Sequence, residues 1–294
     1  MLVAAGRVVY LWHILDHRFQ AKPRPGIKSG EKTMTDASIL LQRDGAVARL
    51  TLNRPDRLNS LTLAMLGELS AVLTDLDGDE SVRVVILTGM GRAFCAGQDL
   101  TDHEAMDDTR AVRSVVERHY NPVIRQIRSL PQPVIAAVNG VAAGAGCSLA
   151  LACDLAVATA SAKFINAFVN IGLIPDGGGS YFLPRLIGQA RALGMTLLGE
   201  PLDAKTAAEW GLIWKAVPDS DFAGEVEALA KRLAEMPTVT IGLIKHAINV
   251  SGHHSLEQQL AVEAELQAAA AETEDYQEGR AAFLEKRKPR FFGR

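Results

Sequence analysis

The sequence contains few cysteines, and none of them pair in a metal or redox motif. Only Cys95, Cys147 and Cys153 occur, and no two of them form a CxxC pair. A low, odd count excludes a disulfide scaffold, and the missing cysteine pair argues against a zinc site. These absences fit a protein of a reducing compartment, so we expect a cytoplasmic chain that binds no metal.

Long apolar runs and an excess of positive charge are also missing. The apolar stretch at residues 8–15 is interrupted by His13 and is followed by no cleavage site of small residues. It is therefore too short for a membrane span and unlike a signal peptide. The formal net charge is -3, which offers no general attraction for nucleic acid. We expect neither a membrane nor a nucleic acid as partner.

The first part of the chain differs from the rest. Residues 1–33 are basic and carry prolines and glycines between positions 23 and 30, whereas Met34 starts an alternating apolar segment. Residues 1–33 are interpreted as an extension, either upstream of the true start or an arm that packs on a neighbouring subunit. Residues 34–220 are predicted to form the core that holds the active site, and residues 221–294 a helical region.

The apolar periodicity predicts strands and helices in alternation up to about residue 165 and helices afterwards. The predicted strands span residues 39–42, 47–52, 84–88, 134–138 and 155–158. The predicted helices span residues 61–76, 107–128, 145–152, 179–187, 189–198, 204–210, 222–235, 239–249, 255–274 and 275–286. Asp44-Gly45 is predicted as a hairpin turn between the first two strands. Such alternation indicates an α/β core.

Two loops of small residues follow buried strands. GRAFCAGQDL (residues 91–100) follows the strand that ends at Thr88, and NGVAAGAGCSLAL (139–151) follows the strand that ends at Val138. Small residues let a ligand approach the backbone, and a helix N-terminus presents unbonded N–H groups. One such loop could simply permit tight packing. Two together favour an oxyanion hole, which would stabilise the enolate of a thioester.

These loops resemble the signature segments of the crotonase (enoyl-CoA hydratase/isomerase) superfamily. The resemblance runs from about Ile39 to the C-terminus and includes LNRPDRLNSLT (52–62) and GLIPDGGGSYFLPRLIG (172–188). It implies an α/β spiral of β-β-α units followed by a helical C-terminal oligomerisation region. It also implies an acyl-CoA thioester substrate, no cofactor bound for chemistry, and a homotrimer or a dimer of trimers.

The resemblance assigns candidate site residues. The oxyanion hole would be formed by the backbone N–H groups of Gln98 and Ala145, the latter at a position commonly occupied by glycine. The coenzyme A positions are Arg57, Leu58, Ala96, Asp99 and Leu100, with Phe283 and Lys286 in the basic tail, often reaching across a subunit boundary. The acyl-pocket positions are Tyr120, Ser148 and Phe168. A solvated charged end would equally explain the tail.

The reaction depends on carboxylates. Hydratases of the family resemble one another in having two glutamates, and Ser148 and Phe168 occupy those positions here. Asp176 lies where some family isomerases carry their acid/base, and moving a double bond needs only one base. The alternative for Asp176 is an N-cap of the following helix. Burial would raise its pKa and a helix start would lower it, so the sequence predicts no direction.

Other motifs leave alternatives open. FCAGQDL, the YNP of residues 120–122 and the ending EGRAAFLEKRKPRF resemble family isomerases that rearrange a ring epoxide of phenylacetyl-CoA. A fatty-acyl isomerase, a hydratase, and a non-catalytic CoA- or RNA-binding relative remain as alternatives. Residues 102–104 could face the pocket or start a helix. Cys95 and Cys147 are interpreted as small packing residues, because no activating base lies near them in sequence.

Overall fold

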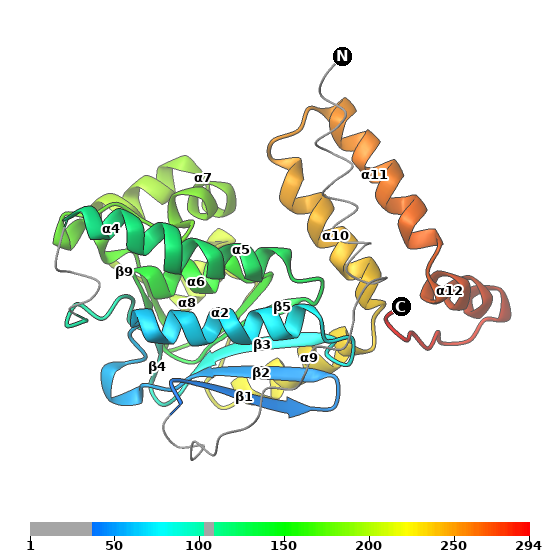
Figure 1. The fold of residues 1–294 in the computed structure, drawn as a ribbon, viewed down its shortest axis with the longest axis horizontal. Helices are drawn as coiled ribbons and strands as arrows, with labels where there is room; N and C mark the ends of the chain where they lie inside the picture. Colours follow the sequence, from blue (N-terminus) through cyan, green and yellow to red (C-terminus); the bar gives the residue numbers. More distant parts are fainter. Residues whose placement is uncertain (1–36, 103–108) are drawn as a thin grey trace. The chain divides into compact units, whose positions relative to one another are not determined.

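The computed structural model describes residues 37–102 and 109–294, without the side chains of residues 109–111. The chain divides into two units, Met1–Ala37 and Ser38–Arg294, and the description below concerns the second (Figure 1). The predicted extension at residues 1–33 and two candidate pocket residues, His103 and Glu104, lie outside the described residues.

A six-stranded sheet forms the centre of the core. In spatial order its strands are β1 (Ile39–Asp44), β2 (Val47–Leu52), β3 (Val84–Gly89), β5 (Val134–Val138), β7 (Leu155–Thr159) and β10 (Lys215–Val217). β1 and β2 form an antiparallel hairpin, and the other neighbours are parallel. Asp44 pairs with Val47, so the turn consists of Gly45 and Ala46. The predicted turn, Asp44-Gly45, was wrong by one residue, because Asp44 still belongs to the strand. Gly45, at φ 55°, takes the left-handed conformation that the tight turn needs.

A second, smaller sheet was not predicted. Its strands, in spatial order, are β4 (Ala93–Cys95), β6 (Val141–Ala143), β8 (Lys163–Ile165) and β9 (Pro201–Asp203). Each contains only three residues, which is too short for a periodic signal. β3, β5 and β7 of the large sheet are followed directly by β4, β6 and β8 of the small sheet. The repeated step from one sheet to the other confirms the predicted crotonase spiral.

Helices account for most of the remaining chain. They are α2 (Leu63–Asp77), α4 (Thr109–Val115), the π-helical turn η2 (Val116–Tyr120), α5 (Asn121–Ser129), α6 (Ala145–Ala152), α7 (Gly179–Leu198), α8 (Ala204–Trp210), α9 (Phe222–Ala234), α10 (Thr238–Ser251), α11 (Leu256–Ala271) and α12 (Glu274–Glu285), with short 3-10 turns η1 (Pro55–Arg57) and η3 (Ala167–Ile171). Gly188 interrupts α7 with a non-helical conformation, at the boundary between the two predicted helices. The prediction of helices alone after residue 165 was wrong, because β9 and β10 complete the two sheets.

The two faces of the large sheet bury different hydrophobic clusters. Successive residues of a strand point to opposite faces. Accordingly, Val85 and Leu87 of β3 belong to the cluster that includes α2, and Val84 and Ile86 pack in the cluster that includes α9. All four side chains are at most 1% exposed, and burial of each stabilises the fold by about 2 kcal/mol. α2 and α5 run side by side over the first of these faces (Figure 1).

The C-terminal helices are anchored to the core by a buried lysine. Lys245 of α10 is 8% exposed, lies 2.7 Å from a carboxylate oxygen of Asp154 and donates to the Gln132 carbonyl at 2.8 Å. A buried ammonium group needs such partners, so they fix the position of α10 against the core. None of the described helices is both long and apolar enough to span a membrane.

Candidate active site

The first small-residue loop is held against the start of α2 by strand-like hydrogen bonds. The Leu61 N–H donates to the Gly97 carbonyl at 2.7 Å, and the Asp99 N–H donates to the Leu61 carbonyl at 2.9 Å. Leu61 and Gln98 thus form a parallel bridge. Because backbone groups alternate along an extended segment, the Gln98 N–H points away from Leu61. The Gln98 N–H therefore takes no part in the bridge with Leu61.

The second small-residue loop ends in the N-terminus of α6. Gly144 is the N-cap, with φ 52° and ψ -125°, a combination that favours glycine. Ala145 is the first residue of the helix, so its N–H has no carbonyl partner within the helix itself. The helix dipole adds a partial positive charge at the same place. Ala145 therefore presents a donor suited to a developing negative charge.

Glycines bring the two loops into contact. A side chain at Gly97 would place its Cβ 2.9 Å from the Ala143 carbonyl oxygen and 3.4 Å from the Ala145 nitrogen. A Cβ at Gly146 would lie 2.3 Å from the Cys95 carbonyl oxygen. Contacts this close exclude any larger residue without a backbone shift. The residue next to Gly97 is Gln98, so the structure places both predicted oxyanion donors where the loops meet.

Asp176 lies in a glycine-rich turn before α7. Its backbone carbonyl accepts hydrogen bonds from the Gly179 N–H at 2.9 Å and from the Ser148 hydroxyl at 2.8 Å. Its carboxylate oxygen Oδ1 is buried and has no hydrogen-bond partner in the part of the chain that the structure describes. Burial raises the pKa of Asp176 to about 6 and outweighs the lowering effect of a hydrogen bond from its own backbone N–H.

The helix that follows does not use Asp176 as a cap. The N-cap of α7 is Gly178, and no side chain caps it. The N-cap interpretation of Asp176 was therefore wrong. Gly177 and Gly178 both have positive φ, at 56° and 83°, and these two residues turn the chain between Asp176 and the helix. The carboxylate therefore does not cap this helix.

Ser148 supports the turn that contains Asp176. Its side chain is completely buried, and a Cβ at Gly179 would lie 2.8 Å from its hydroxyl oxygen. The sequence predicts Ser148 as a pocket residue, whereas the structure places its hydroxyl on the Asp176 carbonyl. Phe168, the other residue that replaces a glutamate, is 7% exposed in η3. Neither position offers a carboxylate.

Tyr120 lies at the end of the π-helical turn η2 and is 3% exposed. Its hydroxyl oxygen has no hydrogen-bond partner in residues 37–102 and 109–294. Burial, and after it the charges of Asp176, Cys95 and Asp102, raise the pKa of Tyr120. The phenol is therefore neutral. Single π-helical turns occur frequently at functional sites.

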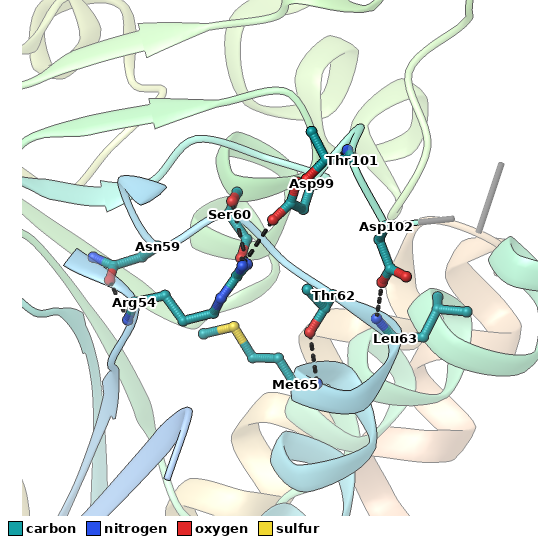
Figure 2. Close-up of polar contacts among 9 residues, drawn as sticks. All are labelled: Arg54, Asn59, Ser60, Thr62, Leu63, Met65, Asp99, Thr101 and Asp102. Carbon is teal, nitrogen blue, oxygen red and sulfur yellow. Dashed lines mark hydrogen bonds and ion pairs between the residues drawn. The ribbon is translucent and has the colours of Figure 1, made fainter. Parts of the chain in front are cut away.

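A second acidic residue near the loops has the opposite environment. We call Arg54, Asn59, Ser60, Asp99 and Thr101 the Arg54–Asp99 cluster (Figure 2). Asp99 is 2.8 Å from an Arg54 nitrogen and accepts from the Thr101 hydroxyl at 2.7 Å and N–H at 3.1 Å. These partners hold the pKa of Asp99 well below its usual range. The sequence predicts Asp99 as a coenzyme A residue, yet its carboxylate is occupied within the cluster.

The neighbouring residues complete the support of the first loop. The Asn59 side chain accepts from the Arg54 N–H at 2.9 Å and donates to the carbonyls of Met90 and Ala93 at 2.9 and 2.8 Å. Asp102 accepts from the Leu63 N–H, the first of α2, at 2.9 Å (Figure 2), and the Thr62 side chain caps the helix. The sequence analysis did not identify Arg54 and Asn59 as residues that support the loop. The available signal was the presence of a charged and an amide side chain inside LNRPDRLNSLT.

The remaining predicted coenzyme A residues fall into two groups. Arg57 is exposed, Leu100 is 52% exposed, and the Leu58 carbonyl accepts from the Ala96 N–H at 3.0 Å, so these four lie around the first loop. Phe283, which is 83% exposed, and Lys286 belong to the end of α12. Within one chain α12 lies far from β4 and the first loop (Figure 1). The structure therefore does not bring the two groups together within a single subunit.

The cysteines in the loops are unreactive by environment. Burial raises the pKa of Cys95 and of Cys147 to about 12, so the nucleophilic thiolate is scarce at neutral pH. The described residues contain no group of three or more His, Cys, Asp or Glu side chains that could hold a metal ion. Asp176 is therefore the candidate acid/base of this region.

Comparison with known proteins assigns the family. A sequence model of the family described as enoyl-CoA hydratase/isomerase matches residues 42–294. The chain belongs to this family. It is 49% identical over 259 residues to the 1,2-epoxyphenylacetyl-CoA isomerase of Escherichia coli, covering 87% of this chain and 98% of that protein.

Relatives of the enoyl-CoA hydratase/isomerase family with other names are also close. A "Probable enoyl-CoA hydratase" of Rhodobacter capsulatus is 47% identical over 261 residues, covering 89% of this chain and 100% of that protein. The crystal structure of an enoyl-CoA hydratase from Bacillus anthracis superposes with a TM-score of 0.83 at 37% identity, over 87% of this chain and 100% of that one. The family and its enzymatic nature are therefore shown, and the choice of reaction depends on the site.

Proposed function

We propose that this enzyme is an acyl-CoA isomerase that uses Asp176 as its single acid/base. The observation that carries the proposal is the carboxylate itself: it is buried, lacks a partner for Oδ1 and has a pKa raised to about 6. A base with a pKa near the working pH is suited to both accept and return a proton. The serine and phenylalanine at the positions where hydratases carry glutamates favour the same conclusion.

The proposed reaction needs one group that accepts and returns a proton, and one oxyanion hole. Asp176 removes a proton from the α-carbon of the thioester, and the electron pair moves into the carbonyl to form an enolate. The N–H groups of Gln98 and Ala145 stabilise the oxygen. Asp176 then returns the proton to the γ-carbon of a 3-enoyl thioester, which leaves the double bond conjugated. No atom is gained or lost.

The same relay would serve a ring-epoxide substrate, the class named for the Escherichia coli relative. In a 1,2-epoxide of phenylacetyl-CoA, breaking the bond between the two epoxide carbons expands the ring to a seven-membered oxepin. One double bond of that ring then lies β,γ to the thioester. Moving a proton from the α- to the γ-carbon conjugates it, as in the enoyl case. One carboxylate therefore suffices for both substrates.

Hydration is the second candidate, because the Rhodobacter capsulatus relative is named a hydratase. Adding water requires one group to activate the water and another to deliver a proton. The Ser148 hydroxyl already donates a hydrogen bond to the Asp176 carbonyl, and Phe168 has no polar group. The site therefore disfavours hydration. A non-catalytic CoA- or RNA-binding protein is disfavoured by the buried base. Retention on immobilised CoA but not on RNA would separate these classes.

The coenzyme A site and the assembly remain parts of the proposal. Arg57, Leu58, Ala96 and Leu100 would contact coenzyme A beside the first loop, with Asp99 holding that loop in place. Phe283 and Lys286 would reach the coenzyme from a neighbouring subunit, since α12 lies far from the loop in its own chain. A homotrimer or a dimer of trimers would supply this contact. Sedimentation at micromolar concentration tests the assembly.

A paired assay tests the function. One reaction contains a 3-enoyl-CoA and is followed by the gain of conjugated thioester absorbance; the other contains a 2-enoyl-CoA and is followed by its loss. Gain without loss supports the isomerase. Loss in the second reaction would identify a hydratase that works without the usual glutamates. If neither changes, the ring-epoxide thioester is tested by mass and ultraviolet spectrum, and no turnover there would refute the isomerase.

A further inference from the structure

The turn that carries Asp176 packs against the first turn of α7. Gly177 and Gly178 have positive φ, and a glycine pair can adopt many backbone conformations, so other contacts must select one. The Phe182 N–H donates to the Gly178 carbonyl at 2.9 Å, and a Cβ at Gly178 would lie 2.5 Å from a carbon of the Phe182 ring. Phe182, which is 8% exposed, therefore packs on the chain two residues after Asp176.

Arg128 of α5 joins this ring to two other helices. Its Cζ lies 5.5 Å from the centroid of the Phe182 ring, within the range of a cation–π contact. The guanidinium group also donates to the Ala152 carbonyl of α6 at 3.5 Å and to the side-chain oxygen of Asn249 in α10. The Asn249 side chain donates in return to the Arg128 carbonyl at 3.2 Å. Arg128 thus links α5, α6 and α10 to the ring that packs on the Asp176 turn.

A second contact connects the same turn of α7 to the end of α10. The Tyr181 hydroxyl lies 3.1 Å from a ring nitrogen of His253, and the two rings stack with their centroids 5.7 Å apart. Tyr181 also packs edge-on against Phe182, with 5.5 Å between the ring centroids. His253 is exposed and Arg128 is half-buried, so water weakens the contacts of Arg128 less. Arg128 is therefore the stronger of the two links.

We propose that Arg128 is a positioning residue, which orients Phe182 and thereby fixes the turn that carries the Asp176 carboxylate. This inference rests on the proposed function, because Arg128 acts through the proposed base. The alternative is that Arg128 only anchors α10. Lys245 already anchors that helix from a buried position, and anchoring does not need a cation over the Phe182 ring. A displaced base slows proton transfer while the loops still bind the thioester, so the loss should appear in kcat.

The kinetic test replaces the guanidinium group. Arg128→Met keeps an unbranched side chain but removes the charge and the N–H donors. We expect its kcat for a 3-enoyl-CoA to fall about tenfold and its KM to stay within about twofold. Arg128→Lys keeps a cation for the ring and should recover most of the lost kcat. Arg125→Met, an exposed control on the same helix, should match wild type. Calorimetry with a saturated acyl-CoA counts the intact binding sites. Unchanged kcat, or a rise in KM as large as the fall in kcat, would overturn the proposal.

A double variant tests whether Arg128 acts through the ring. Phe182→Leu removes the ring but leaves an apolar side chain, and it should lower kcat as well. If both residues act on one route, adding Arg128→Met to Phe182→Leu should lower kcat by no more than about twofold. A further tenfold loss in the double variant would refute the route through Phe182.

Amide hydrogen exchange tests the turn without any turnover. The Gly179 N–H donates to the Asp176 carbonyl, so its exchange rate reports opening of the turn. We expect this N–H to exchange about tenfold faster in Arg128→Met, and faster also in Asn249→Ala, than in wild type and Arg125→Met. Equal rates in all four proteins would rule out the positioning role. The proposed function fails separately, if the exchange responds as expected but the wild-type enzyme isomerises neither a 3-enoyl-CoA nor a ring-epoxide thioester.

Discussion

Asp99 and Asp176 are two acidic residues beside the same pair of loops, in opposite environments. The Asp99 carboxylate forms an ion pair with Arg54 and accepts hydrogen bonds from the N–H and the hydroxyl of Thr101. These partners hold its pKa low. Asp176 has a buried oxygen without a partner and a pKa raised to about 6. A carboxylate that is fully bonded stabilises a structure, whereas one left unbonded in a buried place can exchange a proton.

The contrast extends to the segments that carry the two residues. The loop of Asp99 is fixed by the Arg54–Asp99 cluster (Figure 2), which keeps the backbone of Gln98 in place. In the turn of Asp176, the backbone carbonyl accepts hydrogen bonds from Ser148 and Gly179. Rigid backbone suits an oxyanion hole, because preorganised donors need no rearrangement during reaction. The Asp176 carboxylate, by contrast, keeps one buried oxygen without a partner among the described residues.

The largest expected effect comes from removing the proton acceptor. Asp176→Asn keeps the shape of the side chain but cannot take a proton, so we expect kcat to fall about 10⁴-fold, near the upper limit for a general base. Affinity for a saturated acyl-CoA, measured by calorimetry, should stay within about twofold, because the loops are unchanged. Turnover of the variant within tenfold of wild type would refute the role of base.

The next effect tests the second loop. Ala145→Pro removes one N–H at the first position of a helix, where proline is tolerated. We expect kcat to fall about 10²–10³-fold, as for the loss of one oxyanion donor. Ala145→Gly, which retains the N–H, is the matched control and should stay close to wild type. A folded proline variant with normal kcat would exclude Ala145 from the oxyanion hole.

A smaller effect, on stability, is expected from the bonded carboxylate. Asp99→Asn keeps an acceptor for Thr101 but removes the charge that faces Arg54, so the free energy of unfolding should fall by about 2–3 kcal/mol. Glu117→Gln breaks an exposed ion pair with Arg113 and should cause no measurable change. Urea unfolding at pH 7 measures both. Equal stability of Asp99→Asn and wild type would mean that the cluster does not hold the first loop.

Several parts of this arrangement could be predicted from the sequence, for identifiable reasons. Periodicity located β1, β2, β3, β5 and β7 of the large sheet, most clearly where a strand buries a run of branched apolar residues such as Val84 to Leu87. It missed β10, the three-residue strand of the same sheet. The three-residue strands β4, β6 and β8 carry no such run. Their pairing depends on the loops folding back, which is information from contacts distant in sequence. The small sheet was therefore out of reach.

The candidate site also has some features that the sequence predicts and others that depend on packing. The two loops stand out by residue type, because small residues follow buried strands. Asp176 was identified by the family resemblance, since an aspartate before a helix equally suits an N-cap. The partners that distinguish Asp99 from Asp176 come from elsewhere in the chain, Arg54 among them. Both residues are aspartates next to glycine-containing segments, and only packing shows which is bonded. The direction of the Asp176 pKa shift likewise required the buried surroundings.

The smallest effect compares how the two carboxylates respond to pH. The folded pKa of Asp176, about 6, lies above the value of roughly 3.9 in an unfolded chain. The folded state therefore binds more protons between about pH 4 and 6, and its stability decreases across that window because of this group. Asp176→Asn lacks this loss, so its stability relative to wild type should rise by about 2 kcal/mol from pH 4 to 6 and level off near pH 7. Asp99 has a lowered folded pKa, so its contribution is complete above about pH 4 and is lost only as the pH falls further. Asp99→Asn should thus differ from wild type by a constant amount between pH 5 and 8. Urea unfolding of the three proteins at several pH values gives the curves, and parallel curves for both variants would contradict the opposite environments of Asp99 and Asp176.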